Sequence, residues 1–139
     1  MTLLRLPANY GEAMSTHSRI GILNDDNTVT SIYCQHDGYL SGVGLTLTNC
    51  YTDEDDVIEL MGLGDISALD EDVESCEAYG RDHGEEDTEA RVDDSLEEYQ
   101  TQDEASYAYL FQKGTWYVSV SNEDFVFLTS DLIAETEED

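Results

Sequence analysis

The sequence predicts an α+β domain. Its sheet is expected to be mostly antiparallel, with an N-terminal hairpin plus a C-terminal meander, and two to three helices are expected on one face. β-branched and aromatic residues alternate near both ends of the chain, as they do in half-buried strands. Apolar residues recur at helical spacing between those regions. The length of 139 residues suits one domain, and a hydrophobic content of 40% can fill one modest core.

The first strands and helices are expected in the N-terminal half. RIGIL, the turn-rich NDDN and TVTSIYCQ together predict a hairpin over residues 19–35. Apolar residues over 39–51 follow helical spacing. Thr52 is a candidate N-cap of the next helix, because the acids that follow it suit the positive end of a helix dipole. Gly62 and Gly64 are expected to end that helix.

The C-terminal half is expected to hold the meander. Residues 80–90 are predicted as a loop and 95–99 as a short helix. Strands over 107–112 and 115–121 are joined by a lysine–glycine turn, and FVFLT predicts a third, short strand. Ser130 is a candidate cap for a last helical turn.

The chain is expected to form one domain over residues 15–133. Residues 1–14 are predicted to be a flexible leader and residues 134–139 an acidic disordered tail. No run approaches the roughly 20 apolar residues that a membrane span needs. Three widely spaced cysteines favour a reducing cytoplasm over a disulfide framework.

Acidic residues dominate the composition and are unevenly distributed. The chain has 33 acidic residues and five lysines or arginines, a net charge of −28. Residues 1–52 carry four acids, whereas residues 53–104 carry 22 acids and two arginines. Such a charge repels nucleic acid and anionic membranes and attracts basic surfaces. Direct binding of nucleic acid or of a membrane is therefore excluded.

No pattern predicts a metal or cofactor site. The sequence has no C-x₂-C pair of the kind that zinc sites use. Asp70, Asp72 and Glu74 match the first three ligand positions of a calcium-binding EF-hand loop. Ser75 then stands where that loop needs glycine, and Arg81 stands where it needs the closing glutamate.

One pair of residues deserves examination for catalysis. His36 and Asp37 follow a predicted strand, but they also fit a turn before the next helix. Carboxylate pairs are too abundant here to indicate an acid–base dyad. We therefore expect no catalytic residue, and we do not expect an enzyme.

Most of the chain resembles a known family. The segments SRIGILNDDNTVTSIYCQHDGYLSGVGLTLTNCYTD, LMGLGDISAL, CEAYGRDHGE, SLEEY and YAYLFQKGTWYV resemble a family of small uncharacterised proteins from phages and prophages. Its pattern is S-x-I-G-x-x-N-x-D-G-T-V-x-x-I-Y-C-x-x-D-G-Y-x-x-G-V-G, then L-x-x-L-G-D-I-S-x-L. The resemblance covers residues 15–130. It implies a phage origin and one compact domain, and it implies no activity.

The acidic region predicts a protein that mimics DNA. A DNA strand carries one charge per roughly 3.4 Å. With a helical rise of about 1.5 Å per residue, residues 53–104 would carry one acid per about 3.5 Å if they were fully helical. Carboxylates from two helices and a loop are expected to form two rows that resemble phosphates. The expected partner is a basic host protein that normally binds DNA, such as a restriction, CRISPR or nuclease component, in the cytoplasm of the infected cell. The predicted partner-binding residues are Asp53, Glu54, Asp55, Asp56, Glu59, Asp70, Glu71, Asp72, Glu74, Glu77, Glu85, Glu86, Asp87, Glu89, Asp93, Asp94, Glu97 and Glu98.

Three alternatives stay open at the level of sequence. A charge run is usually only a solvated face, so the acids could belong to a small globular phage protein with an unrelated role. Halophilic adaptation also enriches acids, but it should acidify residues 1–52 as well. A small-ligand or enzymatic module around His36 and Asp37 is the third. A homodimer through an apolar or edge-strand patch, away from the acids, is also compatible with the sequence.

Overall fold

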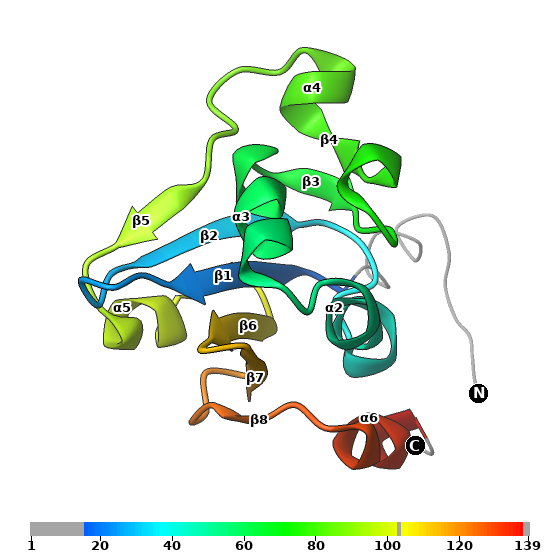
Figure 1. The fold of residues 1–139 in the computed structure, drawn as a ribbon, viewed down its shortest axis with the longest axis vertical. Coiled ribbons are helices and arrows are strands. Elements are labelled where there is room, and N and C mark those ends of the chain that lie inside the picture. Colours follow the sequence, from blue (N-terminus) through cyan, green and yellow to red (C-terminus); the bar gives the residue numbers. More distant parts are fainter. Residues whose placement is uncertain (1–15, 103, 138–139) are drawn as a thin grey trace.

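The computed structural model describes residues 16–102 and 104–137 of the chain. These residues form an α+β fold with one mixed, mostly antiparallel sheet of eight strands (Figure 1). The strand order is β4-β3-β2-β1-β6-β7-β8, and β5 pairs with β2. The α+β class and the mostly antiparallel sheet are confirmed.

The predicted hairpin and meander lie side by side in this sheet. Strands β1 (Ser18–Leu23) and β2 (Val29–Cys34) pair antiparallel around the turn of residues 24–28. Strands β6 (Tyr107–Gln112) and β7 (Thr115–Val120) do the same around the lysine–glycine turn. The short strand β8 (Val126–Phe127) completes the meander.

Two parallel pairings make the sheet mixed. β1 pairs parallel with β6, and β2 pairs parallel with the short strand β3 (Ile66–Ala68). Both connections contain helices, and a parallel pairing needs a long crossover of this kind. β4 (Glu77–Ala78) and β5 (Arg91–Asp93) are too short and too charged for strand periodicity to reveal them.

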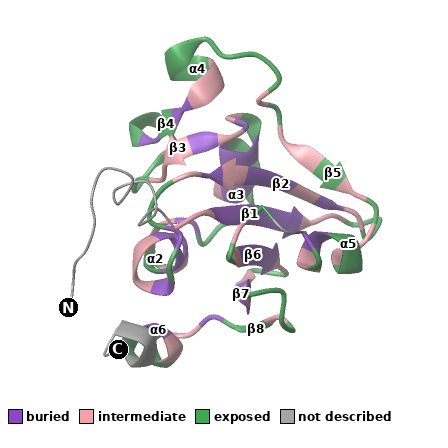
Figure 2. Ribbon diagram, turned by 180° about the vertical axis from the view of Figure 1, so that it is seen from behind, coloured by how far each residue is buried: buried purple, intermediate pink, exposed green. Residues whose placement is uncertain are grey.

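Several helices cover the first face of the sheet. They are a π-helical turn at Leu40–Gly44, α2 (Leu45–Cys50), α3 (Glu54–Gly62) and α6 (Ser130–Glu137). Figure 2 shows buried residues along the central strands and on the inner sides of these helices. The main core contains Ile20, Ile22, Ile32, Cys34, Leu40, Val43, Leu47, Tyr51, Val57, Leu60, Ile66, Tyr109, Phe111, Trp116, Val118 and Ile133.

The second face of the sheet is covered by α5 (Leu96–Gln100), which differs from the expected placement of all helices on one face. Ser95 caps this helix by accepting a hydrogen bond from the amide of Glu98. The Tyr99 ring lies against Gly21, where an added Cβ would come within 3.0 Å of the ring. A glycine in the strand therefore makes room for the aromatic side chain that holds α5 on this face.

Other boundaries also differ from the predictions. α3 begins one residue later than expected, so Asp53 occupies the N-cap position in place of Thr52, and its side chain makes no capping hydrogen bond. A short helix, α4 (Tyr79–His83), lies partly within the predicted loop. α6 extends through residue 137 into the predicted tail. The predicted leader, residues 1–14, lies outside the described residues, and no described helix is long and apolar enough to cross a membrane.

Candidate functional site

The predicted partner-binding carboxylates lie almost entirely at the surface. Of these 18 residues, 16 are exposed, and only Asp56 and Asp93 are half-buried. They are displayed on α3, on residues 70–77, on the loop after α4, and on β5 and α5. The sequence therefore located the exposed acids, but their arrangement depends on how those elements pack.

Arg81 is exposed, but its guanidinium is occupied by contacts with neighbouring groups of the same chain. Its guanidinium donates to the main-chain oxygens of Val73 and Glu74 at 3.1 and 3.3 Å, and also to that of Cys76. It forms a second set of contacts with the carboxylate of Asp82, with the Nε–Oδ1 distance at 3.0 Å. This contact lowers the pKa of Asp82 to about 2. A guanidinium fork is suited to such multiple acceptors, so Arg81 fixes the path of residues 73–76.

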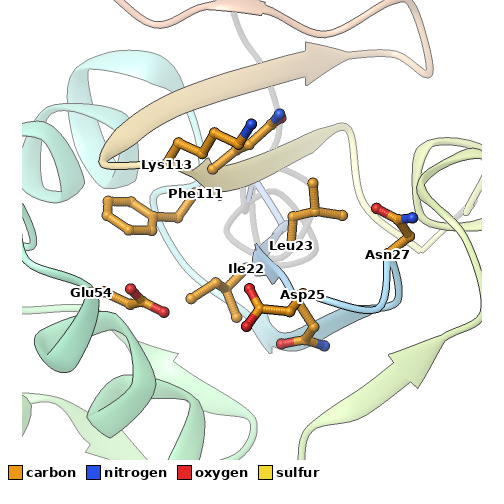
Figure 3. Close-up of a pocket in the computed structure, with 9 residues that line it drawn as sticks. Ile22, Leu23, Asp25, Asn27, Glu54, Phe111 and Lys113 are labelled. Carbon is orange, nitrogen blue, oxygen red and sulfur yellow. The ribbon is translucent and has the colours of Figure 1, made fainter.

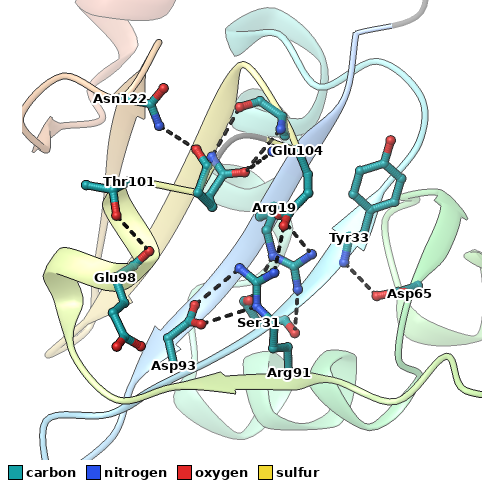
Figure 4. Close-up of polar contacts among 12 residues, drawn as sticks. Arg19, Ser31, Tyr33, Asp65, Arg91, Asp93, Glu98, Thr101, Glu104 and Asn122 are labelled. Atoms are coloured by element: carbon teal, nitrogen blue, oxygen red, sulfur yellow. Dashed lines mark hydrogen bonds and ion pairs between the residues drawn. The ribbon is translucent and has the colours of Figure 1, made fainter.

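Two further arginines form a polar network on the second face of the sheet (Figure 4). Arg19 is 5% exposed and donates from Nε and Nη2 to the hydroxyl and main-chain oxygens of Ser31, at 3.0 and 3.1 Å. Arg91 contacts Asp93 at 3.3 Å and Glu104 at 2.9 Å. Glu104 also lies 3.8 Å from Arg19 and so bridges the two guanidinium groups. Burial and the nearby charge of Arg91 lower the pKa of Arg19.

The described arginines therefore leave most of the surface acids without a cationic partner. Asp53, Glu54, Asp55, Asp56, Glu59, Glu71, Glu85, Glu86, Asp87, Glu89, Asp94 and Glu97 have carboxylates that join no hydrogen bond or ion pair within the described part of the chain. Lys113 is exposed and belongs to no ion pair among the described residues. Most of the negative charge of residues 53–104 is thus exposed to solvent.

Two of these four clusters of carboxylates, within residues 53–59 and 70–77, lie together. A groove of about 110 Å³ lies between α3 and residues 71–73. Asp56 and Glu59 line it from α3, and Glu71 and Asp72 line it from the facing segment. Tyr51 also lines the groove. Acidic side chains therefore line two sides of one groove.

The segment that faces α3 is held by hydrogen bonds. The carboxylate of Asp72 accepts from the amide of Ser75 at 2.9 Å and caps the helical turn at Val73–Ser75. The thiol of Cys76 accepts from the amide of Asp70 at 3.2 Å, and the Tyr51 hydroxyl donates to the Asp70 main-chain oxygen at 2.8 Å. These contacts fix the backbone that carries the carboxylates.

The other two clusters lie elsewhere. Residues 93–98 belong to β5 and α5, and α5 packs on the second face of the sheet, opposite α3. Residues 85–89 follow α4 beyond the β3–β4 end of the sheet (Figure 1). The carboxylates of α3 and those of α5 therefore lie on opposite sides of the sheet.

Several acids make contacts within the fold. Glu77 contacts His83 at 2.7 Å, and the Glu98 carboxylate accepts from the amide of Asp94 at 3.0 Å. Asp65 is not among the residues predicted from the sequence. Its carboxylate accepts a hydrogen bond from the amide of Tyr33 at 2.9 Å. That contact joins residues 32 positions apart, so no local signal reveals it.

The pair His36 and Asp37 takes the form of a turn. Asp37 has a φ of 60°, and its carboxylate accepts a hydrogen bond from the Tyr39 hydroxyl at 3.1 Å. No hydrogen bond joins the His36 ring to Asp37 within the described residues. A small cavity of about 140 Å³ adjoins both residues. Among the described residues, no group of three or more His, Cys, Asp or Glu side chains is arranged to hold a metal ion.

Comparison of the chain with models of known protein families, with curated proteins and with solved structures finds no match.

Proposed function

We propose that this chain is a phage-encoded acidic protein that mimics DNA and occupies the DNA-binding surface of a basic host protein. The observation that carries the proposal is the set of exposed carboxylates with no cationic partner among the described residues. The guanidinium groups of the described arginines contact main-chain oxygens and a few carboxylates. The excess negative charge therefore remains available for a basic surface.

The groove between α3 and residues 71–73 is the proposed centre of the interface. Its carboxylates stand on a helix and on a hydrogen-bonded segment, so little ordering is needed when a partner binds. A lysine or arginine of the partner can place its charged head among these carboxylates. The clusters on α5 and after α4 contribute mainly to long-range attraction, which raises the association rate.

The class of partner protein is inferred from its charge, because the fold does not indicate it. A protein whose surface carries Lys and Arg for DNA phosphates presents the complementary charge. The resemblance to a phage family supports a restriction, CRISPR or nuclease component in the host cytoplasm. In this proposal the chain acts by binding and performs no catalysis.

Competition with DNA tests the proposal. The chain is mixed at physiological salt with candidate host DNA-binding proteins that hold a labelled duplex, and release of the duplex is measured. We expect release from at least one of them, and we expect it to weaken as salt is raised. Failure to release the duplex from any candidate would contradict the proposal.

Two pairs of substitutions locate the interface. Glu59→Gln with Glu71→Gln removes two charges from the groove, and Asp94→Asn with Glu97→Gln removes two charges from the opposite face. None of these four carboxylates has a partner within the described chain, so both variants should fold. We expect the groove pair to weaken competition by about tenfold and the control pair by about twofold or less, because close charge pairs contribute more than distant ones. If neither pair changes competition, the acids form only a solvated face.

A further inference from the structure

A separate cavity of about 330 Å³ lies where β1 and β6 end (Figure 3). These two strands are parallel neighbours, with Ile22 opposite Phe111, so their carboxyl ends open at the same edge. In sheets with parallel strands, ligands commonly bind outside the carboxyl ends. The volume falls within the range of small-molecule sites.

The inner part of this cavity is apolar and fixed. Ile22 and Phe111 line it and are 7% and 2% exposed. The Phe111 ring packs edge-on against Trp116, with ring centroids 5.1 Å apart and planes at 62°. An apolar group that enters the cavity would therefore meet an ordered surface.

The rim carries both signs of charge. Lys113 lies on the β6–β7 turn, where its φ of 53° and the φ of 79° at Gly114 fix a tight hairpin connection. Asp25 lies on the β1–β2 turn and Glu54 at the start of α3. Figure 3 shows Lys113 on one side of the cavity and the two carboxylates on the other.

These three charges are unpaired within the described chain. Neither Asp25 nor Glu54 forms an ion pair with Lys113, and none of the three side chains hydrogen-bonds to another described residue. Lys113 is the one lysine of the chain. Opposite charges that face one cavity without meeting leave room for a ligand that contacts both.

We propose that this cavity binds a small zwitterion, an α-amino acid with an apolar or aromatic side chain. Its ammonium group would lie between Asp25 and Glu54, and its carboxylate would contact Lys113. Its side chain would cover Phe111. The field of a chain with net charge −28 opposes a net anion, whereas a zwitterion carries no net charge and satisfies both signs.

Binding of L-phenylalanine tests the proposal. Titration is followed by amide chemical shifts and by calorimetry on the full chain without any partner protein. We expect shifts at residues 22–25 and 111–114. N-acetyl-L-phenylalanine lacks the ammonium group and L-phenylalaninamide lacks the carboxylate. At physiological salt, which screens the long-range field of the chain, each should bind about tenfold more weakly, the effect of losing one charge-assisted contact.

Variants separate this site from the acidic surface. Lys113→Met and Asp25→Asn should each weaken L-phenylalanine binding by about tenfold. Glu86→Gln, which removes a charge on the loop after α4, should leave binding unchanged. The inference is overturned if L-phenylalanine shifts no resonance of residues 22–25 or 111–114 at millimolar concentration, or if the two analogues bind as well as L-phenylalanine. The analogues decide the question even if a variant fails to fold, and none of these measurements depends on a DNA-binding partner.

Discussion

The central strands and the outer segment of residues 70–89 are held in place in different ways. Ile20, Ile32, Tyr109 and Val118 are fully buried in β1, β2, β6 and β7. In residues 70–89, by contrast, only Cys76 and Ala78 are buried. The outer segment is instead held by the contacts of Arg81 and of Asp72, and by the thiol of Cys76.

This difference explains how residues 70–89, which are strongly acidic, keep a defined backbone conformation. Apolar burial is non-directional and is shared among many residues, so the strands do not depend on one contact. Hydrogen bonds at the surface are directional and few, so the outer segment depends on particular residues and can open locally without global unfolding. The carboxylates are thereby displayed on an ordered backbone that needs little apolar sequence.

The largest effect is expected in the core. Leu60 of α3 is fully buried, and Leu60→Ala should lower the free energy of unfolding by about 3 kcal/mol, through lost burial and the cavity left behind. Ile58 lies on the same helix but is 52% exposed, so Ile58→Ala serves as the control and should cost less than about 1 kcal/mol. Urea denaturation measures both. Equal effects would contradict the assignment of the core to that side of α3.

A smaller effect is expected where the core meets the outer segment. Gly64 has a φ of 75°, and an added Cβ there would lie 2.1 Å from the main-chain oxygen of Thr88. Gly64→Ala should therefore lower the free energy of unfolding by about 2 kcal/mol and displace residues 85–89. Gly62→Ala is the matched control, because nothing lies within 4 Å of its added Cβ. Denaturation curves for both variants measure this effect. If Gly64→Ala left the free energy of unfolding unchanged, the close approach of residue 64 to the Thr88 main-chain oxygen would not require glycine.

A local effect is expected at Arg81. Arg81→Ala should speed amide hydrogen exchange in residues 73–78 while leaving exchange in β1 and β6 unchanged, because its contacts are confined to this segment. Arg81→Lys should not restore protection, since an ammonium group cannot reproduce the guanidinium fork. Uniform acceleration across the sheet would instead place Arg81 in the global folding unit.

The smallest effect is expected from pH. The contact with Arg81 lowers the pKa of Asp82 from 3.8 to about 2. Because the pKa of Asp82 is lowered by folding, the ionised Asp82 carboxylate stabilises the folded state above pH 3.8. That contribution is lost as pH falls toward 2. Protection of the Ala78 amide, which donates to Asp82, should fall over this window. Asp82→Asn should remove that pH dependence, and an unchanged profile would rule out Asp82 as its source.

The amino-acid sequence by itself determined the local elements of this protein. Alternating β-branched residues and turn residues at NDDN and at the lysine–glycine pair predicted β1, β2, β6 and β7 close to their observed bounds. The short helix predicted over residues 95–99 is α5, which the structure places one residue further along the chain. These signals are local, because each depends on periodicity or on a cap within a few residues. The exposure of the acids followed from their charge in the same way.

Only the tertiary structure decided how these elements are assembled. The parallel pairing of β1 with β6 brings Ile22 beside Phe111, 89 residues away along the chain, and it creates the edge at which the cavity of about 330 Å³ lies. The fit of Tyr99 against Gly21 places α5 on the second face and so divides the acidic clusters. Such contacts depend on side-chain packing between distant segments, which local sequence patterns do not encode. The charge was evident from the sequence, but the groove that gathers part of it between α3 and residues 71–73 was not.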